Sequence, residues 1–182
     1  MRSVVICGSL RYGDEIERFA ARLRKLGAPL VFTPDFKYLR RDFVELEERE
    51  RMTSKNYKKR VPELVLRHFD RIRKADICFI YNKDGYLGVN TTLEVGFAHG
   101  RDMVIYSLEP ESPTEEGGEI CREILFTEVV STPEELCEKL KLIYADSGKE
   151  NGGTFSNPNF FKEENEPQKR KRTKSREQEQ LI

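Results

Sequence analysis

The sequence predicts a doubly wound α/β fold, in which five mostly parallel strands in the order 2-1-3-4-5 carry helices on both faces. Two observations support this prediction. Short apolar runs rich in β-branched residues are typical of strands buried on both faces. Segments of helical length with one apolar face separate these runs, and strict alternation of strands and helices is typical of a parallel sheet. The runs lie at residues 3–7, 30–33, 77–81, 103–108 and 127–130.

The N-terminal part of the chain predicts a strand, a helix and a second strand. After the strand at residues 3–7, a turn with a glycine at each end covers residues 8–13, and Asp14 is expected to cap the helix. This helix should end at Gly27, before the strand at residues 30–33. Its apolar stripe consists of Ile16, Phe19, Leu23 and Leu26.

Residues 40–74 are dense in charged side chains, most of which are expected to solvate exposed faces. The pattern predicts a helix over residues 43–52, a polar break over residues 53–57 and a second helix that begins at Pro62. That second helix carries His68. Its inward-facing positions are expected to be Leu64, Val65, Phe69 and Ile72.

The C-terminal part alternates in the same way and then changes in composition. After residue 146, Asn, Gly, Ser, Glu, Gln and Lys dominate. We therefore expect one α/β domain over residues 1–146 and a disordered, charged tail over residues 147–182. The last elements of the domain are expected to be a strand at 103–108, a short helix at 119–125, a strand at 127–130 and a helix at 133–144 with Pro133 in its first turn.

Residues 84–98 join the third predicted strand to a helix and contain Glu94. A glycine-rich turn leads into this helix, which Asn90 or Thr91 is expected to cap. Loops that follow parallel strands lie at the carboxyl edge of the sheet, where α/β folds bind ligands, so Glu94 in the first turn is expected to line a cleft. The spacing of Thr91 and Glu94 also fits a capping box, in which the glutamate only reaches back to the cap. The expected inward positions are Leu93, Phe97 and Ala98.

The pattern Gly-Tyr-x-Gly-x-Asn-Thr-x-x-Glu-x-Gly-Phe-Ala at residues 85–98 resembles the nucleophile motif of the nucleoside 2-deoxyribosyltransferase superfamily. This superfamily includes deoxynucleoside 5'-monophosphate N-glycosidases. The resemblance covers residues 1–144 and implies a flavodoxin-like fold that cleaves or exchanges an N-glycosidic bond. It makes Glu94 the nucleophile that attacks the anomeric carbon, and it implies a homo-oligomer.

A second motif, Gly8-Ser9-Leu10-Arg11, follows the first strand and should face the same edge as the loop before Glu94. Glycines let a backbone approach a ligand closely, a serine hydroxyl can donate, and a guanidinium can pair with phosphate oxygens. An ordinary tight turn fits the same residues. The motif resembles the 5'-phosphate loop of the monophosphate-specific branch of the superfamily, which favours a nucleoside 5'-monophosphate over a free nucleoside. A tyrosine common in that strand is replaced by Val5.

His68 and the loop after the third strand supply the remaining site candidates. The pattern His-Phe-x-x-Ile-x-x-Ala-Asp at residues 68–76 resembles one branch of the superfamily, although most members have an aspartate at the position of His68. The helix runs antiparallel to the third strand, so His68 lies towards the cleft side, whereas Asp76 opens that strand at the opposite edge and is expected to be structural. Candidates for substrate binding are Asn82, Asp84, Gly85, Tyr86, Gly88, Asn90 and Thr91.

Composition limits the other classes of function. The chain has 182 residues, and 32 basic side chains balance 32 acidic ones, so nucleic acid is not an expected partner. Without an apolar run of about 20 residues or a signal-peptide pattern, we expect no membrane association and a cytoplasmic location. The four cysteines have no metal-ligand spacing, so neither a metal nor another cofactor is expected.

The sequence therefore predicts an enzyme that acts on a nucleoside or its 5'-monophosphate. Two other interpretations stay open. A catalytically inactive nucleotide-binding or scaffold protein would keep the same fold, and Val5 and His68 favour it. A nucleic-acid-associated protein would act through the basic cluster at residues 169–172.

Overall fold

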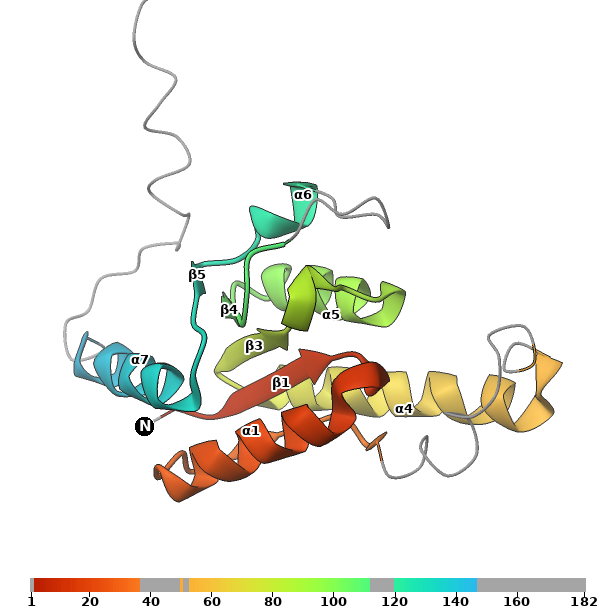
Figure 1. The fold of residues 1–182 in the computed structure, drawn as a ribbon, viewed down its shortest axis with the longest axis horizontal. Coiled ribbons are helices and arrows are strands. Elements are labelled where there is room, and N and C mark those ends of the chain that lie inside the picture. Colours follow the sequence, from red (N-terminus) through yellow and green to blue (C-terminus); the bar gives the residue numbers. More distant parts are fainter. Residues whose placement is uncertain (1, 37–49, 51–52, 112–119, 147–182) are drawn as a thin grey trace, which may run out of the picture.

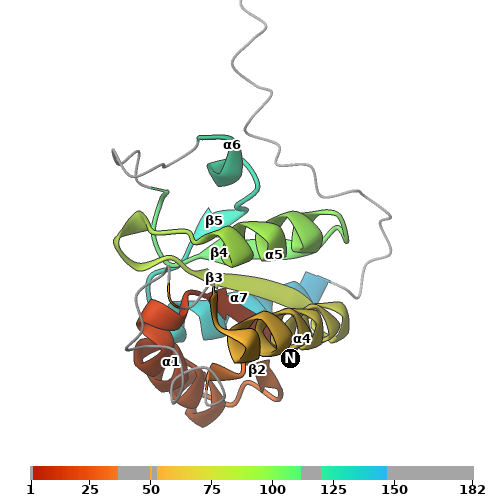
Figure 2. The same ribbon diagram turned by 90° about the vertical axis from the view of Figure 1, so that its right-hand side faces the viewer.

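The computed structural model describes residues 2–36, 50, 53–111 and 120–146. Its centre is a fully parallel five-stranded sheet in the order β2-β1-β3-β4-β5, which confirms the predicted fold and strand order (Figures 1 and 2). The longest pairing joins β1 to β3, from Val4 opposite Ile77 to Gly8 opposite Tyr81. The strands are β1 (Val4–Gly8), β2 (Val31–Phe32), β3 (Ile77–Tyr81), β4 (Val104–Ser107) and β5 (Glu128–Val129).

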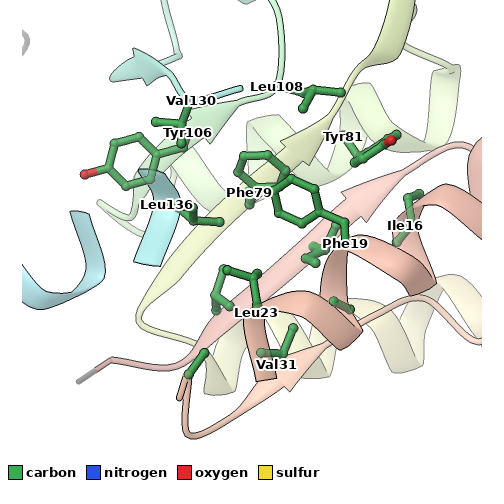
Figure 3. Close-up of a cluster of buried hydrophobic side chains, with 14 of the residues drawn as sticks. Ile16, Phe19, Leu23, Val31, Phe79, Tyr81, Tyr106, Leu108, Val130 and Leu136 are labelled. Atoms are coloured by element: carbon green, nitrogen blue, oxygen red, sulfur yellow. The ribbon is translucent and has the colours of Figure 1, made fainter. Parts of the chain in front are cut away.

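Two apolar layers hold helices against the two faces of this sheet. One layer packs α1 (Gly13–Lys25) and α7 (Pro133–Asp146) on the sheet, with Phe19 stacked on Phe79 at 4.7 Å between ring centroids (Figure 3). The other packs α4 (Lys55–Lys74) and α5 (Val89–His99) on the opposite face. A short helix, α6 (Ile120–Glu123), precedes β5.

Side chains alternate between these layers along each strand. In β1, Val4 and Ile6 belong to the layer of α1, whereas Val5 and Cys7 belong to the layer of α4 and α5. This alternation places Cys7, one residue before the end of β1, beside the helices that carry His68 and Glu94.

Two predicted helix starts are wrong. Asp14 does not cap α1, because the 3-10 turn η1 (Leu10–Tyr12) leads straight into the helix and Ser9 caps that turn, accepting from the Arg11 backbone N–H at 3.2 Å. Pro62 does not begin α4. Ser54 caps this helix about two turns earlier and Pro62 lies inside it, so the predicted polar break holds the true start.

The start and the inner face of α5 also differ from the prediction. Gly88 is its N-cap, and neither Asn90 nor Thr91 provides a cap. Its inner face also differs from the predicted one, because Leu93 is 55% exposed. The buried positions are Thr91, Glu94, Val95 and Ala98. The predicted helix over residues 43–52 and the predicted tail lie outside the described residues, except that Glu50 is helical.

The end of α1 provides a test of backbone conformation. Gly27 has φ 96°, and the Ala28 N–H donates to the Leu23 carbonyl at 3.1 Å, as in a glycine-terminated helix. Gly27→Ala should therefore lower the free energy of unfolding by about 1 kcal/mol in urea titrations. Gly96→Ala is the matched control. It lies inside α5 with no atom within 4 Å of the new Cβ, and should raise that free energy by about 0.5–1 kcal/mol. A loss of stability in both variants would contradict the prediction.

Candidate functional site

The loops that follow β1 and β3 meet at the carboxyl edge of the sheet, as predicted. The guanidinium carbon of Arg11 lies 4.1 Å from the centroid of the Tyr86 ring. Nearby, the Tyr12 hydroxyl donates to Asp84 Oδ2 at 3.5 Å. These two contacts join the Gly8–Arg11 motif to the loop that leads into α5.

The loop between β3 and α5 is held in a tight turn. Asp84 and Gly85 have φ of 58° and 68°, and the Gly85 N–H donates to the Asn82 carbonyl at 2.9 Å. The Asn82 side chain is fully buried and binds the backbone of Glu109, donating at 2.7 Å and accepting at 3.0 Å. Asn82 thus anchors this loop to the segment after β4, while the exposed Asp84 carries a left-handed backbone at the carboxyl edge of the sheet.

The other predicted binding residues separate into buried and accessible ones. Thr91 is 3% exposed on the inner face of α5, whereas Asn90 is exposed in its first turn. Tyr86 is half-buried, with its ring under Arg11, and Gly88 is half-buried at the N-cap. The accessible group therefore consists of Asn90, Tyr86 and Gly88, together with Asp84.

The four residues of the Gly8–Arg11 motif have different roles in the structure. A Cβ on Gly8 would lie 2.8 Å from Ile16 Cδ1, so tight packing alone accounts for this glycine. Ser9 caps η1, and Leu10 packs against the core. Arg11 is exposed, and its guanidinium is the group of this motif best placed to meet an anion.

Glu94 points into the protein and not back towards the start of its helix. Its side chain is 6% exposed, and it lies in the second turn of α5 because the helix begins at Val89. No side chain caps this helix, so the capping-box interpretation is wrong. The placement in the first turn is also wrong, for the same reason.

His68 and Cys7 face Glu94 from two other elements. His68 Nε2 lies 3.9 Å from Glu94 Oε1 and 3.3 Å from Cys7 Sγ. His68 is 3% exposed and Cys7 is fully buried. The structure therefore brings the two predicted catalytic residues together and adds Cys7, which is not among the site residues predicted from the sequence.

Burial determines how these three side chains ionise. It raises the pKa of Glu94 to about 8, although a hydrogen bond with Cys7 lowers it. It also lowers the pKa of His68 to about 4, an effect that the Arg71 charge reinforces and Asp35 opposes. The pKa of the Cys7 thiol is raised well above its ordinary value, chiefly by burial. Near pH 7 the cluster is therefore mostly uncharged.

Two further features lie outside this cluster. Asp76 is at the opposite edge of the sheet, as predicted, where its carboxylate accepts from the Ser3 N–H at 2.8 Å. An open hollow of about 290 Å³ lies at the carboxyl ends of β3 and β4 and does not include Glu94. Its lining residues are Tyr81, Lys83, Leu108, Glu109 and Ser131. Within the described part of the chain, none of the helices combines the length and apolar character needed to cross a membrane.

No family model and no curated protein matches this sequence. Among solved structures, the fold is similar to that of the CMP N-glycosidase BcmB from Clostridium botulinum. The TM-score is 0.40 at 14% sequence identity, and the match covers 78% of this chain and 98% of that one. At this distance neither an activity nor a residue's role transfers from one protein to the other.

Proposed function

We propose that the protein cleaves or exchanges the N-glycosidic bond of a nucleoside 5'-monophosphate, with Glu94 as the nucleophile. The supporting observation is the position of Glu94, whose carboxyl turns inward beside the carboxyl end of β1 and within 3.9 Å of His68. A cap residue on an exposed helix start would not need this burial. The motif resemblance at residues 85–98 supports the same role.

In the proposed reaction, the Glu94 carboxylate attacks C1' while the base departs with the electrons of the glycosidic bond. A glycosyl ester on Glu94 follows, and water or a second base attacks C1' to release it, so the configuration at C1' is retained. His68 is neutral at pH 7 because its pKa is about 4, and it can accept the proton of the attacking water. Glu94 must be ionised to attack, and with a pKa of about 8 roughly a tenth of it is ionised at pH 7.

The direct test is a substrate panel. The protein is incubated with nucleosides and their 5'-monophosphates, each with and without an acceptor base, and released base is measured by chromatography. Release from a monophosphate supports the proposal, and product formed only with an acceptor identifies transfer. Absence of release from every substrate would contradict catalysis.

Arg11 is expected to select the 5'-phosphate, because the residue is exposed at the carboxyl edge of the sheet and its guanidinium is held on the Tyr86 ring. Loss of a charge-assisted contact costs about 1.5–3 kcal/mol, so Arg11→Ala should weaken monophosphate binding about tenfold to a hundredfold and leave nucleosides unchanged. Calorimetry with both ligands measures this. Arg67→Ala, which removes an exposed arginine paired with Glu63 on α4, is the matched control. Equal losses for both ligands would refute a phosphate contact.

A nucleotide-binding protein without turnover is the second candidate. The burial of Glu94, which favours its protonated form, supports this alternative. Binding of a monophosphate without release of base would identify it. A homo-oligomer and a cytoplasmic location stay predictions from the sequence.

A further inference from the structure

Three side chains with metal-binding atoms converge between β1, α4 and α5. One ligand atom from each of Cys7, His68 and Glu94 lies within 4.8 Å of the other two. Each comes from a different element, so the sheet and two packed helices fix their separation. The three residues are far apart in the sequence, so metal-ligand spacing along the chain does not reveal this cluster.

The separations fit a tetrahedral ion. With Zn–S of about 2.3 Å and Zn–N and Zn–O of about 2.0–2.2 Å, two ligand atoms around zinc lie roughly 3.4–3.6 Å apart. The distance from Cys7 Sγ to His68 Nε2 is 3.3 Å, and that from His68 Nε2 to Glu94 Oε1 is 3.9 Å. Both distances lie within a few tenths of an ångström of the tetrahedral values, and the ligand atoms of Cys7 and Glu94 lie within 4.8 Å of each other.

Two buried polar atoms of this cluster lack hydrogen-bond partners among the described residues. These atoms are Glu94 Oε2 and His68 Nδ1. A buried polar atom without a partner is costly, and an ion bound by the carboxylate would remove part of that cost. Metal-bound histidines usually donate their second N–H to a neighbour, so the unpaired Nδ1 should make the affinity lower than at a fully supported zinc site.

We propose that Cys7 Sγ, His68 Nε2 and the Glu94 carboxylate form a binding site for a thiophilic divalent transition-metal ion such as Zn²⁺. One thiolate, one imidazole and one carboxylate suit this class of ion and do not suit Mg²⁺ or Ca²⁺, which prefer oxygen ligands. Binding releases the thiol and carboxyl protons to solvent. Because all three side chains are nearly or fully buried, the ion must enter through a local opening, and uptake should be slow.

This site goes beyond the proposed glycosidase and opposes it. An ion held by Glu94 takes the electron pair with which the carboxylate would attack C1'. Zn²⁺ should therefore inhibit cleavage, and a chelator should restore it. This consequence alone rests on the proposed function. The binding site itself is tested without any substrate.

The test uses the full chain, freed of metal by a chelator, and titrates it with Co²⁺ as a spectroscopic substitute for Zn²⁺. A thiolate-to-cobalt charge-transfer band should develop with one ion per chain and disappear when Zn²⁺ is added. Cys7→Ser should abolish the band, and His68→Gln and Glu94→Gln should each weaken binding by at least about tenfold. The melting temperature of each ion-free variant shows whether it folds.

The chain supplies matched controls. His99 is the second of its two histidines and is exposed, and Cys121 is its exposed cysteine. His99→Gln and Cys121→Ser should leave the cobalt spectrum and the affinity unchanged. The proposal is overturned if the parent gives no band, if Cys121→Ser removes it, or if His68→Gln and Glu94→Gln bind as the parent does. If Cys7→Ser fails to fold, the other two variants still decide. Cleavage by a protein that binds no metal would refute this site alone, and metal binding by a protein that cleaves no substrate even after a chelator has removed the ion would refute only the glycosidase.

Discussion

Glu94→Gln should abolish the turnover of any substrate that the parent protein cleaves, while the fold and ligand binding survive. A glutamine amide has no charge to stabilise the developing oxocarbenium ion and cannot form a viable glycosyl ester. We expect a loss of several orders of magnitude, which corresponds to more than about 4 kcal/mol in the activation barrier. Chromatographic assay of released base, at a pH where the parent is active, measures the effect.

The control for this experiment is Asp84→Asn. Asp84 is the exposed carboxylate of the neighbouring loop, with its Oδ2 near the Tyr12 hydroxyl, so its loss should affect binding more than the chemical step. If Glu94→Gln keeps more than about a tenth of the parental activity, the deficit is below about 1.4 kcal/mol and Glu94 is not the nucleophile. Collapse of activity in Asp84→Asn alone would transfer that role to Asp84.

The fold was predictable because its determinants are local and repeated. The strand at Ile77–Tyr81 is a continuous apolar run buried on both faces, and the stripe from Ile16 to Leu23 has helical spacing. Alternation of such segments leaves few topologies other than a parallel sheet. The observed order of the five strands is one of the two that are common among doubly wound sheets.

Helix starts were less predictable because several residues compete to be the cap. Ser54, Thr53 and Pro62 all carry start signals, and in the structure Ser54 is the cap, accepting from the Tyr57 N–H at 3.4 Å. At α5 the N-cap is Gly88, and the face that packs on the sheet buries Glu94 and leaves Leu93 exposed. Because α5 begins two or three residues earlier than predicted, Glu94 lies in its second turn and not at the capping-box position of the first turn.

The site was only partly predictable, since it depends on contacts between distant elements. Antiparallel packing of α4 against β3 was enough to place His68 on the side of Glu94. Cys7 was missed, although the alternation along β1 puts it on the same face as Val5. Attention to which face each strand residue occupies would have identified it.

The buried carboxyl of Glu94 should make the stability of the protein fall as the pH rises. The pKa of Glu94 is about 8 in the folded protein against 4.5 as its ordinary value, so the unfolded chain loses this proton at lower pH than the folded one. The contribution of the protonated Glu94 carboxyl to the free energy of unfolding is fully present below pH 4.5 and is lost as the pH rises through 8. The difference between the two pKa values corresponds to a loss of about 5 kcal/mol in the free energy of unfolding, at about 1.36 kcal/mol for each pH unit.

Glu94→Gln separates this effect from the other titrating groups of the cluster, since His68 and Cys7 are common to both proteins. Gln resembles the protonated carboxyl at every pH. In urea unfolding with a chelator present, the variant and the parent should differ by less than about 1 kcal/mol at pH 5, and the variant should be the more stable by several kcal/mol at pH 8.5. The low pKa of His68 makes the protein less stable as the pH falls from 6.5 to about 4, which is the opposite pH dependence. It therefore does not affect the comparison at pH 8.5. Identical pH dependence of the two proteins would mean that water reaches the Glu94 carboxyl in solution, as it would in an open cleft.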